Sequence, residues 1–191
     1  MRKPVVLDLE TQHTFREFAE HKKLRISTVA VYDYGTDTMK SFLESQLADL
    51  YKILENASML IGFNIVNFDL PVLQAYYPGD VTQFKTFDIL DDIKEKLGHR
   101  LALDDVVRAT LGKKKSGHGL AAIELYKEGK IKELQQYCED DVTLTRQLFD
   151  FGVENGEIYY MDHMGKATIK VDWKRVFAEK EKNDISLTLP F

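Results

Sequence analysis

Two acidic residues stand inside an apolar stretch near the N-terminus of this 191-residue chain. Residues 5–11 read VVLDLET, which is typical of a buried strand, and Asp8 and Glu10 are two positions apart in it. Side chains alternate across a strand, so both carboxylates point to the same face. Adjacent carboxylates in a core are costly unless a cation neutralises them, as a divalent metal with oxygen ligands does. On this stretch alone, a strand whose end has reached solvent explains the acids equally well.

Two later segments carry acids that can join this pair. Residues 62–69 read GFNIVNFD, where a predicted strand ends in a loop and Asp69 opens a helix. An acid there is also common as a partner of the helix dipole. In a long helix predicted over residues 130–151, closing near Gly152, Tyr137 and Asp141 lie four positions apart on the apolar face. A buried acid without a nearby cation is unfavourable, so this acid needs a partner.

The elements that must position these residues alternate along the chain. Strands are predicted over residues 24–34, 38–43, 57–63 and 86–90, and helices over 45–56, 68–77, 90–97, 103–111 and 120–128. Residues 157–162 and 167–172 alternate around a turn at 163–166 and predict a β-hairpin. This order indicates an α/β fold with a mixed central sheet flanked by helices and a C-terminal hairpin.

The composition is that of one soluble globular domain. With 44% apolar and 30% charged residues the chain is not of the disordered class, and its apolar runs are too short to span a bilayer. Asp8 interrupts the first apolar run too early for a signal peptide. A single cysteine, Cys138, excludes an internal disulfide and suits a reducing compartment. We therefore expect a cytoplasmic protein without membrane contact.

The net charge of −5 argues against a nucleic-acid partner, because phosphate binding usually shows as an excess of Lys and Arg. An acidic metal cluster would account for several of the negative charges, and bound ions would cancel them locally. The basic residues are also bunched, at positions 21–25 and 99–115, although each bunch alone is explained by a solvated loop. Composition leaves the partner open.

The order of the acidic motifs resembles the DEDD exonucleases in their tyrosine-bearing branch. The resemblance covers residues 4–151 and rests on the stretches DLET (8–11), NIVNFD (64–69) and YCEDD (137–141). The third stretch is similar to the proofreading domains of B-family polymerases and their stand-alone relatives. The histidine branch would carry His at the position of Gln136, so the tyrosine branch is the better match. Each motif alone is weak, and three in order are a strong signal.

This resemblance implies an RNase H-like fold and hydrolysis of nucleotides from the 3′ end of single-stranded DNA or RNA. It also implies two metal ions per site, Mg²⁺ or Mn²⁺, which activate the attacking water and stabilise the leaving oxygen. By resemblance, Asp8 bridges the ions, Glu10 and Asp141 complete the nucleophile-side site, and Asp69 supports the second ion.

Three other residues receive roles from the same resemblance. Tyr137 orients the attacking water, since a phenol is a better positioner than base at neutral pH. Thr11 contacts the terminal nucleotide, and Asn64 serves substrate binding by holding the loop that carries Asp69. Residues 12–15, QHTF, fit no pattern of the family and leave the 3′-end pocket undefined. The basic loop at 113–119 is placed to steer a phosphate backbone, as an alternative to a plain solvated loop.

A single domain is predicted over residues 1–175, followed by a charged spacer and apolar tail over 176–191. The tail sequence 185–191, ISLTLPF, favours a last strand docked on the domain. It also resembles the short peptides with which bacterial replication proteins bind the sliding clamp, although the leading Gln is missing. As a whole, the alternative to an exonuclease is a non-catalytic nucleic-acid-binding or scaffolding domain of the same fold. The presence of all four acids and the tyrosine favours the enzyme.

Overall fold

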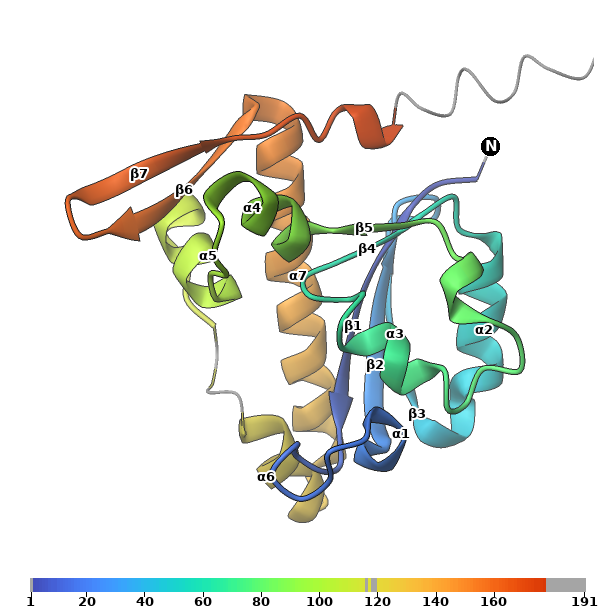
Figure 1. Cartoon of the computed structure of the whole chain (residues 1–191). Coiled ribbons are helices and arrows are strands. Elements are labelled where there is room, and N and C mark those ends of the chain that lie inside the picture. The colour runs from blue at the N-terminus through green and yellow to red at the C-terminus, as the bar shows by residue number, and fades with distance from the viewer. Residues whose placement is uncertain (1, 116, 118–119, 178–191) are drawn as a thin grey trace, which may run out of the picture.

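The computed structural model describes residues 2–115, 117 and 120–177, and a five-stranded mixed sheet lies at its centre (Figure 1). The strand order is β3-β2-β1-β4-β5. The first three strands form an antiparallel meander, and the last two run parallel to β1. Their bounds are β1 Val5–Thr11, β2 Ile26–Asp33, β3 Thr38–Leu43, β4 Leu60–Gly62 and β5 Thr86–Asp88. The predicted mixed α/β sheet is confirmed.

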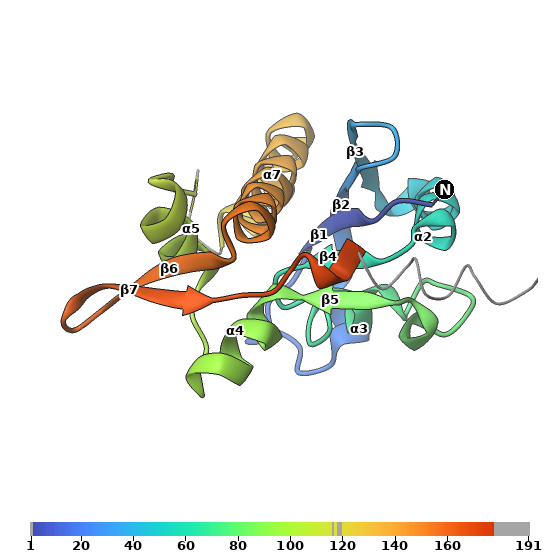
Figure 2. The ribbon, with the colours of Figure 1, turned by 90° about the horizontal axis from the view of Figure 1, so that it is seen from above.

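Helices cover both faces of this sheet (Figure 2). Buried residues of α4, α5 and α7 form one core with one face of the sheet, and those of α2 and α3 form a second core with the other. The helices are α1 His21–Leu24, α2 Leu47–Asn56, α3 Asp69–Leu73, α4 Ile89–Leu97, α5 Leu103–Leu111, α6 Ala121–Lys127 and α7 Ile131–Asn155. Single 3₁₀ turns occupy Glu44–Gln46 and Val81–Gln83. Among the described residues, no helix has the length and apolar character needed to cross a membrane.

Strand β1 divides its side chains between the two cores. Leu7 and Leu9 are buried in the core under α2 and α3, whereas Val6 is buried in the core under α7. Because side chains alternate, Asp8 and Glu10 follow Val6 onto the α7 face. The prediction that the two acids share one face is confirmed, and that face is the one covered by the longest helix.

Helix α7 is longer than predicted. It does not close near Gly152 but continues to Asn155, and Gly156 ends it with a left-handed φ of 68°. Gly152 is needed for packing, because an added Cβ would lie 2.2 Å from Cε3 of Trp173, so only glycine lets the indole approach the helix. The ring of Trp173 stacks on Phe149 at 5.7 Å and 10°. A glycine needed for close packing was therefore mistaken for a helix stop.

The C-terminal hairpin is confirmed as β6 Glu157–Asp162 and β7 Gly165–Lys170 (Figure 1). Its turn is tighter than the predicted 163–166, because Gly165 is already paired with Asp162 and takes a φ of 124° that other residues rarely adopt. The spacer and tail over 178–191 lie outside the described residues, and so do the docked strand and the clamp peptide predicted for 185–191. The domain boundary at 175 stays a prediction.

Candidate active site

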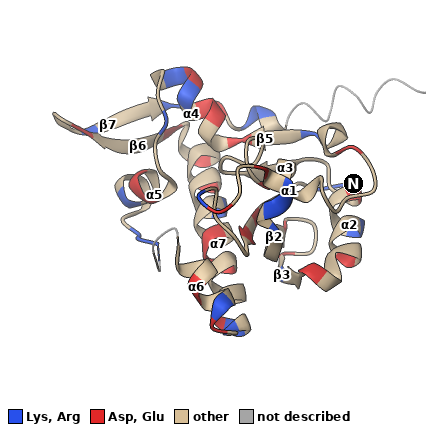
Figure 3. Cartoon of the chain, turned by 60° about the horizontal axis from the view of Figure 1, so that its bottom comes forward, with Lys and Arg blue, Asp and Glu red and all other residues tan. Residues whose placement is uncertain are grey.

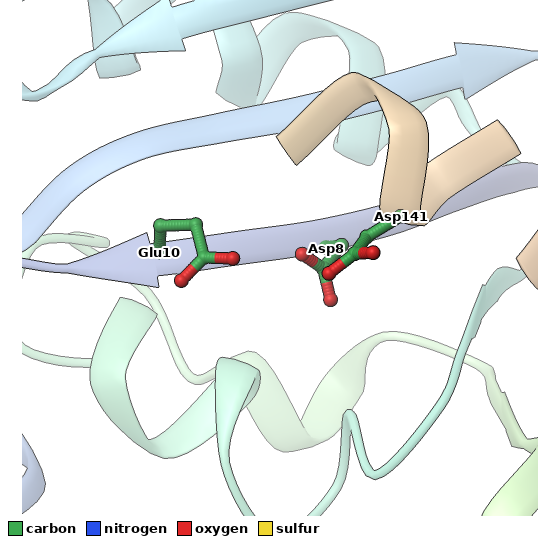
Figure 4. Close-up of side chains that lie close together, drawn as sticks. All are labelled: Asp8, Glu10 and Asp141. Carbon is green, nitrogen blue, oxygen red and sulfur yellow. The ribbon is translucent and has the colours of Figure 1, made fainter. Parts of the chain in front are cut away.

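Three carboxylates from two distant parts of the chain meet between β1 and α7. Oxygen atoms of Asp8, Glu10 and Asp141 lie within 4.8 Å of one another (Figure 4). Asp69, the first residue of α3, lies beside them, because its Oδ1 accepts a hydrogen bond from the backbone N–H of Leu9 at 2.9 Å. All four acids line one cavity of about 330 Å³.

The other predicted site residues divide into two groups. Tyr137 and Thr11 line the same cavity as the acids. The hydroxyl of Thr11 donates to the carbonyl of His13 at 2.8 Å, so its proton is engaged within the protein. Asn64 is not among the described residues that line the cavity, and its Oδ1 instead accepts from Arg100 at 2.6 Å. The structure brings six of the seven predicted residues together, and Asn64 is the one that lies outside this group.

An aromatic group of side chains lines the same cavity as the acids. It is formed by Phe15, Phe63 and Phe68, with Leu120 at the rim. Phe15 and Leu120 are each 48% exposed, which is unusual for large apolar side chains. Phe15 meets Phe68 edge to face at 5.9 Å. The cavity is therefore lined both by carboxylates and by aromatic rings.

Asp88 holds the loop that leads to Asp69, a role that the sequence analysis missed. Its carboxylate accepts hydrogen bonds from the backbone N–H groups of Asn64 and Val66, at 2.9 and 3.0 Å. The same carboxylate caps α4 by accepting from Leu90 and Asp91. An acid directly before a helix is a recognisable N-cap signal, but nothing local shows that this cap also binds a loop 22 to 24 residues earlier.

Lys115 is the second residue that the sequence analysis missed. Its Nζ lies 2.6 Å from Oδ2 of Asp141, and both side chains are largely buried. Residue types alone could not distinguish it from its neighbours in the run Lys113-Lys114-Lys115. Figure 3 shows this lysine-bearing loop after α5 and the basic helix α1 on either side of α7. Of these basic residues, Lys115 is the one that lines the cavity.

The acids of the cluster hold their protons more tightly than free carboxyl groups. Burial, followed by the charge of Asp141, raises the pKa of Asp8 to about 7, although Lys115 lowers it. Burial and the neighbouring acids raise the pKa of Glu10 and of Asp69 well above their ordinary values. Burial also raises the pKa of Asp141, against the lowering effect of Lys115. One lysine does not balance four carboxylates.

Tyr137 stays protonated at neutral pH in this environment. Burial raises the pKa of its phenol to about 12, with the neighbouring acids acting in the same direction and Lys115 against it. Cys138, the next residue on α7, is fully buried, and its thiol lies 3.4 Å from the backbone oxygen of Asp8. Cys138 therefore packs as a small core residue.

The cluster has the features of a site for a hard divalent cation. Oδ1 of Asp141 is buried and has no hydrogen-bond partner among the described residues. Carboxylate oxygens grouped within 4.8 Å match the ligand type that Mg²⁺ and Mn²⁺ prefer. The residues present therefore fit a metal ion.

Comparison with known proteins identifies relatives of this chain. A family model of the RNase_H superfamily matches residues 5–151. Trypanosoma brucei RNase D superposes with a TM-score of 0.59 at 16% identity over 81% of this chain and 58% of that one. The family B DNA polymerase of the archaeon Pyrobaculum calidifontis superposes with a TM-score of 0.61 at 16% identity, over 80% of this chain and 25% of the polymerase. No curated protein sequence matches the chain.

These structural relatives share the fold, and this chain matches only part of the length of each. The chain spans a little over half of the RNase D chain and a quarter of the polymerase. RNase D has also been solved with RNA U12, in a structure that superposes with a TM-score of 0.59.

Proposed function

Because the chain belongs to the RNase_H superfamily, we propose that it is a metal-dependent 3′–5′ exonuclease of the tyrosine-bearing DEDD type. The observation that carries this proposal is the meeting of Asp8, Glu10, Asp69 and Asp141 with Tyr137 around one cavity. Four acids from three elements that are distant in sequence would repel one another without a cation. Their convergence is expected of a metal site and is not expected of a domain that only binds or scaffolds.

The carboxylates divide between two ions in this proposal, Mg²⁺ or Mn²⁺. Asp8, Glu10 and Asp141, whose oxygens are mutually close, would hold the first, and Asp69 with Asp8 would hold the second. Bound ions would supply a nucleophilic water and stabilise charge on the leaving oxygen. The protein's part is to hold these oxygens in place, through the Leu9 N–H on Asp69 and the burial of Asp141 on α7.

Tyr137 would orient the attacking water. Its phenol stays protonated, so it can both donate and accept a hydrogen bond but is a poor general base. It lines the cavity together with the carboxylates, where a nucleophile must lie. Its role is therefore positioning by direct contact with the water.

Single-stranded DNA or RNA fits the aromatic side of the cavity. Bases stack on exposed rings without sequence preference, and Phe15 and Phe68 present such rings next to the acids. The complex of RNase D with RNA U12 supports a nucleic-acid substrate, since that protein has the same fold. Digestion of both nucleic acids decides whether DNA or RNA is the preferred substrate.

The test is digestion of 5′-labelled single-stranded DNA and RNA of one sequence, with Mg²⁺ or Mn²⁺. We expect a ladder that shortens from the 3′ end and disappears with EDTA and in Asp8→Asn. Asp140→Asn is the matched control, because Asp140 is next to Asp141 on α7 but lies outside this cavity and bonds Gln136. Binding of nucleic acid without cleavage, with metal bound, would instead establish the non-catalytic alternative.

A further inference from the structure

The side chain of Lys115 extends into the acid cluster, and a hydrogen bond to α5 holds its backbone in place. Its N–H donates to Oδ1 of Asp104, in the first turn of α5, at 2.9 Å. Its side chain extends from there into the cavity lined by Asp8 and Glu10, and Nζ lies 5.8 Å from the centre of the Tyr137 ring. The ammonium group is thus held within the site itself.

The ion pair of Lys115 differs from the exposed ion pairs of the described chain and is comparable in burial to the pair Lys96–Asp92. The pairs Lys52–Asp49 and Arg108–Asp105 are each at least half exposed, as is usual for surface ion pairs. By contrast, the side chains of Lys115 and Asp141 are 22% and 4% exposed. A surface pair contributes little, whereas a buried cation among several carboxylates offsets a repulsion that water cannot screen.

The position of the ammonium conflicts with a metal on Asp141. Mg²⁺ binds carboxylate oxygens at about 2.0–2.1 Å, and Nζ already lies 2.6 Å from Oδ2 of the same residue. Two cations that share one carboxylate at these distances repel each other strongly. An ion bound through Oδ2 therefore requires the ammonium to withdraw, and an ion bound through the unpartnered Oδ1 of the same carboxylate would still be repelled by it.

We propose that Lys115 is an internal counter-ion that occupies the acid cluster when no metal is bound and competes with the metal for Asp141. This inference rests on the proposed metal-dependent function and adds a form of regulation to it. Lys115 stabilises the fold without metal, and it lowers the affinity of the site for metal by the same contact. The two effects have opposite signs, which a purely structural lysine does not produce.

The experiment compares wild type, Lys115→Met and Lys115→Arg as full-length proteins. Free Mn²⁺ is measured by its electron paramagnetic resonance signal without nucleic acid, and thermal unfolding is followed in EDTA. Competition between two ligands is a negative coupling, which typically changes affinity by about 5- to 150-fold. We expect Lys115→Met to bind Mn²⁺ about tenfold more tightly and to melt at a lower temperature in EDTA, and Lys115→Arg to behave like wild type.

The matched control is Lys113→Met, two residues earlier in the same loop, whose Nζ donates to Gln147 outside the cavity. It should leave both Mn²⁺ affinity and melting temperature unchanged. Equal or weaker Mn²⁺ binding by Lys115→Met, with a wild-type circular dichroism spectrum, would overturn the counter-ion role and leave the exonuclease proposal standing. Lys115→Gln replaces the methionine variant if that protein does not fold. Failure of every variant to bind Mn²⁺ would overturn the metal-dependent function itself, and the counter-ion role with it.

Discussion

A single buried carboxylate and a cluster of carboxylates lie in different parts of the molecule, and they differ in how their negative charges are balanced. Asp92 of α4 is a single acid with three donors: Trp173 Nε1 at 2.8 Å, Lys96 Nζ at 2.6 Å and an Arg175 nitrogen at 3.2 Å. The cluster around Asp141 gathers four acids, with Lys115 as the cation in direct contact.

The difference is that between an acid that stabilises the fold and acids that are proposed to bind metal. Every oxygen of Asp92 is engaged, so its burial ties the C-terminal segment to α4. In the cluster one carboxylate oxygen, Oδ1 of Asp141, lacks a partner among the described residues, and the pKa of each of the four acids is raised. Such an arrangement lowers stability unless a further ligand binds, which is typical of functional sites.

The largest expected effect is on activity, from the loss of one acid in the cluster. Asp8→Asn should lower the exonuclease rate by about a thousandfold or more, because it removes a metal ligand that is worth several kcal/mol in the transition state. The same variant should melt at a higher temperature than wild type in EDTA at pH 8, since it removes a charge from a crowded cluster. Single-turnover digestion measures the rate, and thermal unfolding measures the stability. A lower melting temperature for Asp8→Asn would show that Asp8 stabilises the fold as Asp92 does.

The opposite result is expected from the Asp92 region. Trp173→Ala should lower the free energy of unfolding by about 3–5 kcal/mol, as expected for truncating a fully buried ring, while the rate per folded molecule is unchanged. Urea denaturation measures the first quantity. Trp173→Phe is the matched variant, because it retains a ring against Phe149 but removes the donor to Asp92, and it should cost only about 1–3 kcal/mol.

Asp88 lies between these two cases, as a structural acid that serves the site. Asp88→Ala removes the acceptor of four backbone N–H groups and should lower the free energy of unfolding by about 1–3 kcal/mol. Because the loop to Asp69 is then less well held, the turnover rate should fall at saturating substrate, with partial rescue by Asp88→Asn.

The control for Asp88 is Asp80→Ala. Asp80 also caps a helical turn, by accepting from the N–H of Thr82, but it is exposed and away from the cavity. It should change turnover little. Equal turnover in Asp88→Ala and Asp80→Ala would show that Asp88 acts on stability alone.

The most gradual expected effect is a dependence on pH. Burial and the charge of Asp141 raise the pKa of Asp8 to about 7 in the folded protein, above its ordinary value near 4, so the folded state binds more protons between these values. In EDTA the free energy of unfolding should therefore fall as the pH rises from about 4 to 7, and it should fall less in Asp8→Asn. Mn²⁺ affinity should rise over the same range, because metal and proton compete for the carboxylates. Urea denaturation and Mn²⁺ titration at several pH values check both trends.

Much of the site was predictable because its key relations are local. Alternation in Val5–Thr11 places Asp8 and Glu10 on one face, and a spacing of four residues places Tyr137 and Asp141 on one helix face. Both relations follow from backbone geometry over a few residues, and the structure confirms both. Their assigned roles as metal ligands and water positioner stay predictions.

The sequence by itself therefore determined most of the elements, their order and the faces on which the acids lie. Only the tertiary structure decided which lysine of the run Lys113-Lys114-Lys115 meets Asp141, and that Asp88 caps a helix and a distant loop at once. It also decided that the ring of Trp173 packs closely against Gly152. In the same way, only the tertiary structure shows that Asn64 accepts a hydrogen bond from Arg100 and does not line the cavity. The physical reason is that periodicity and capping act over one or two turns of chain. These other contacts join residues that are well separated in the chain, and their meeting depends on how the whole chain is packed.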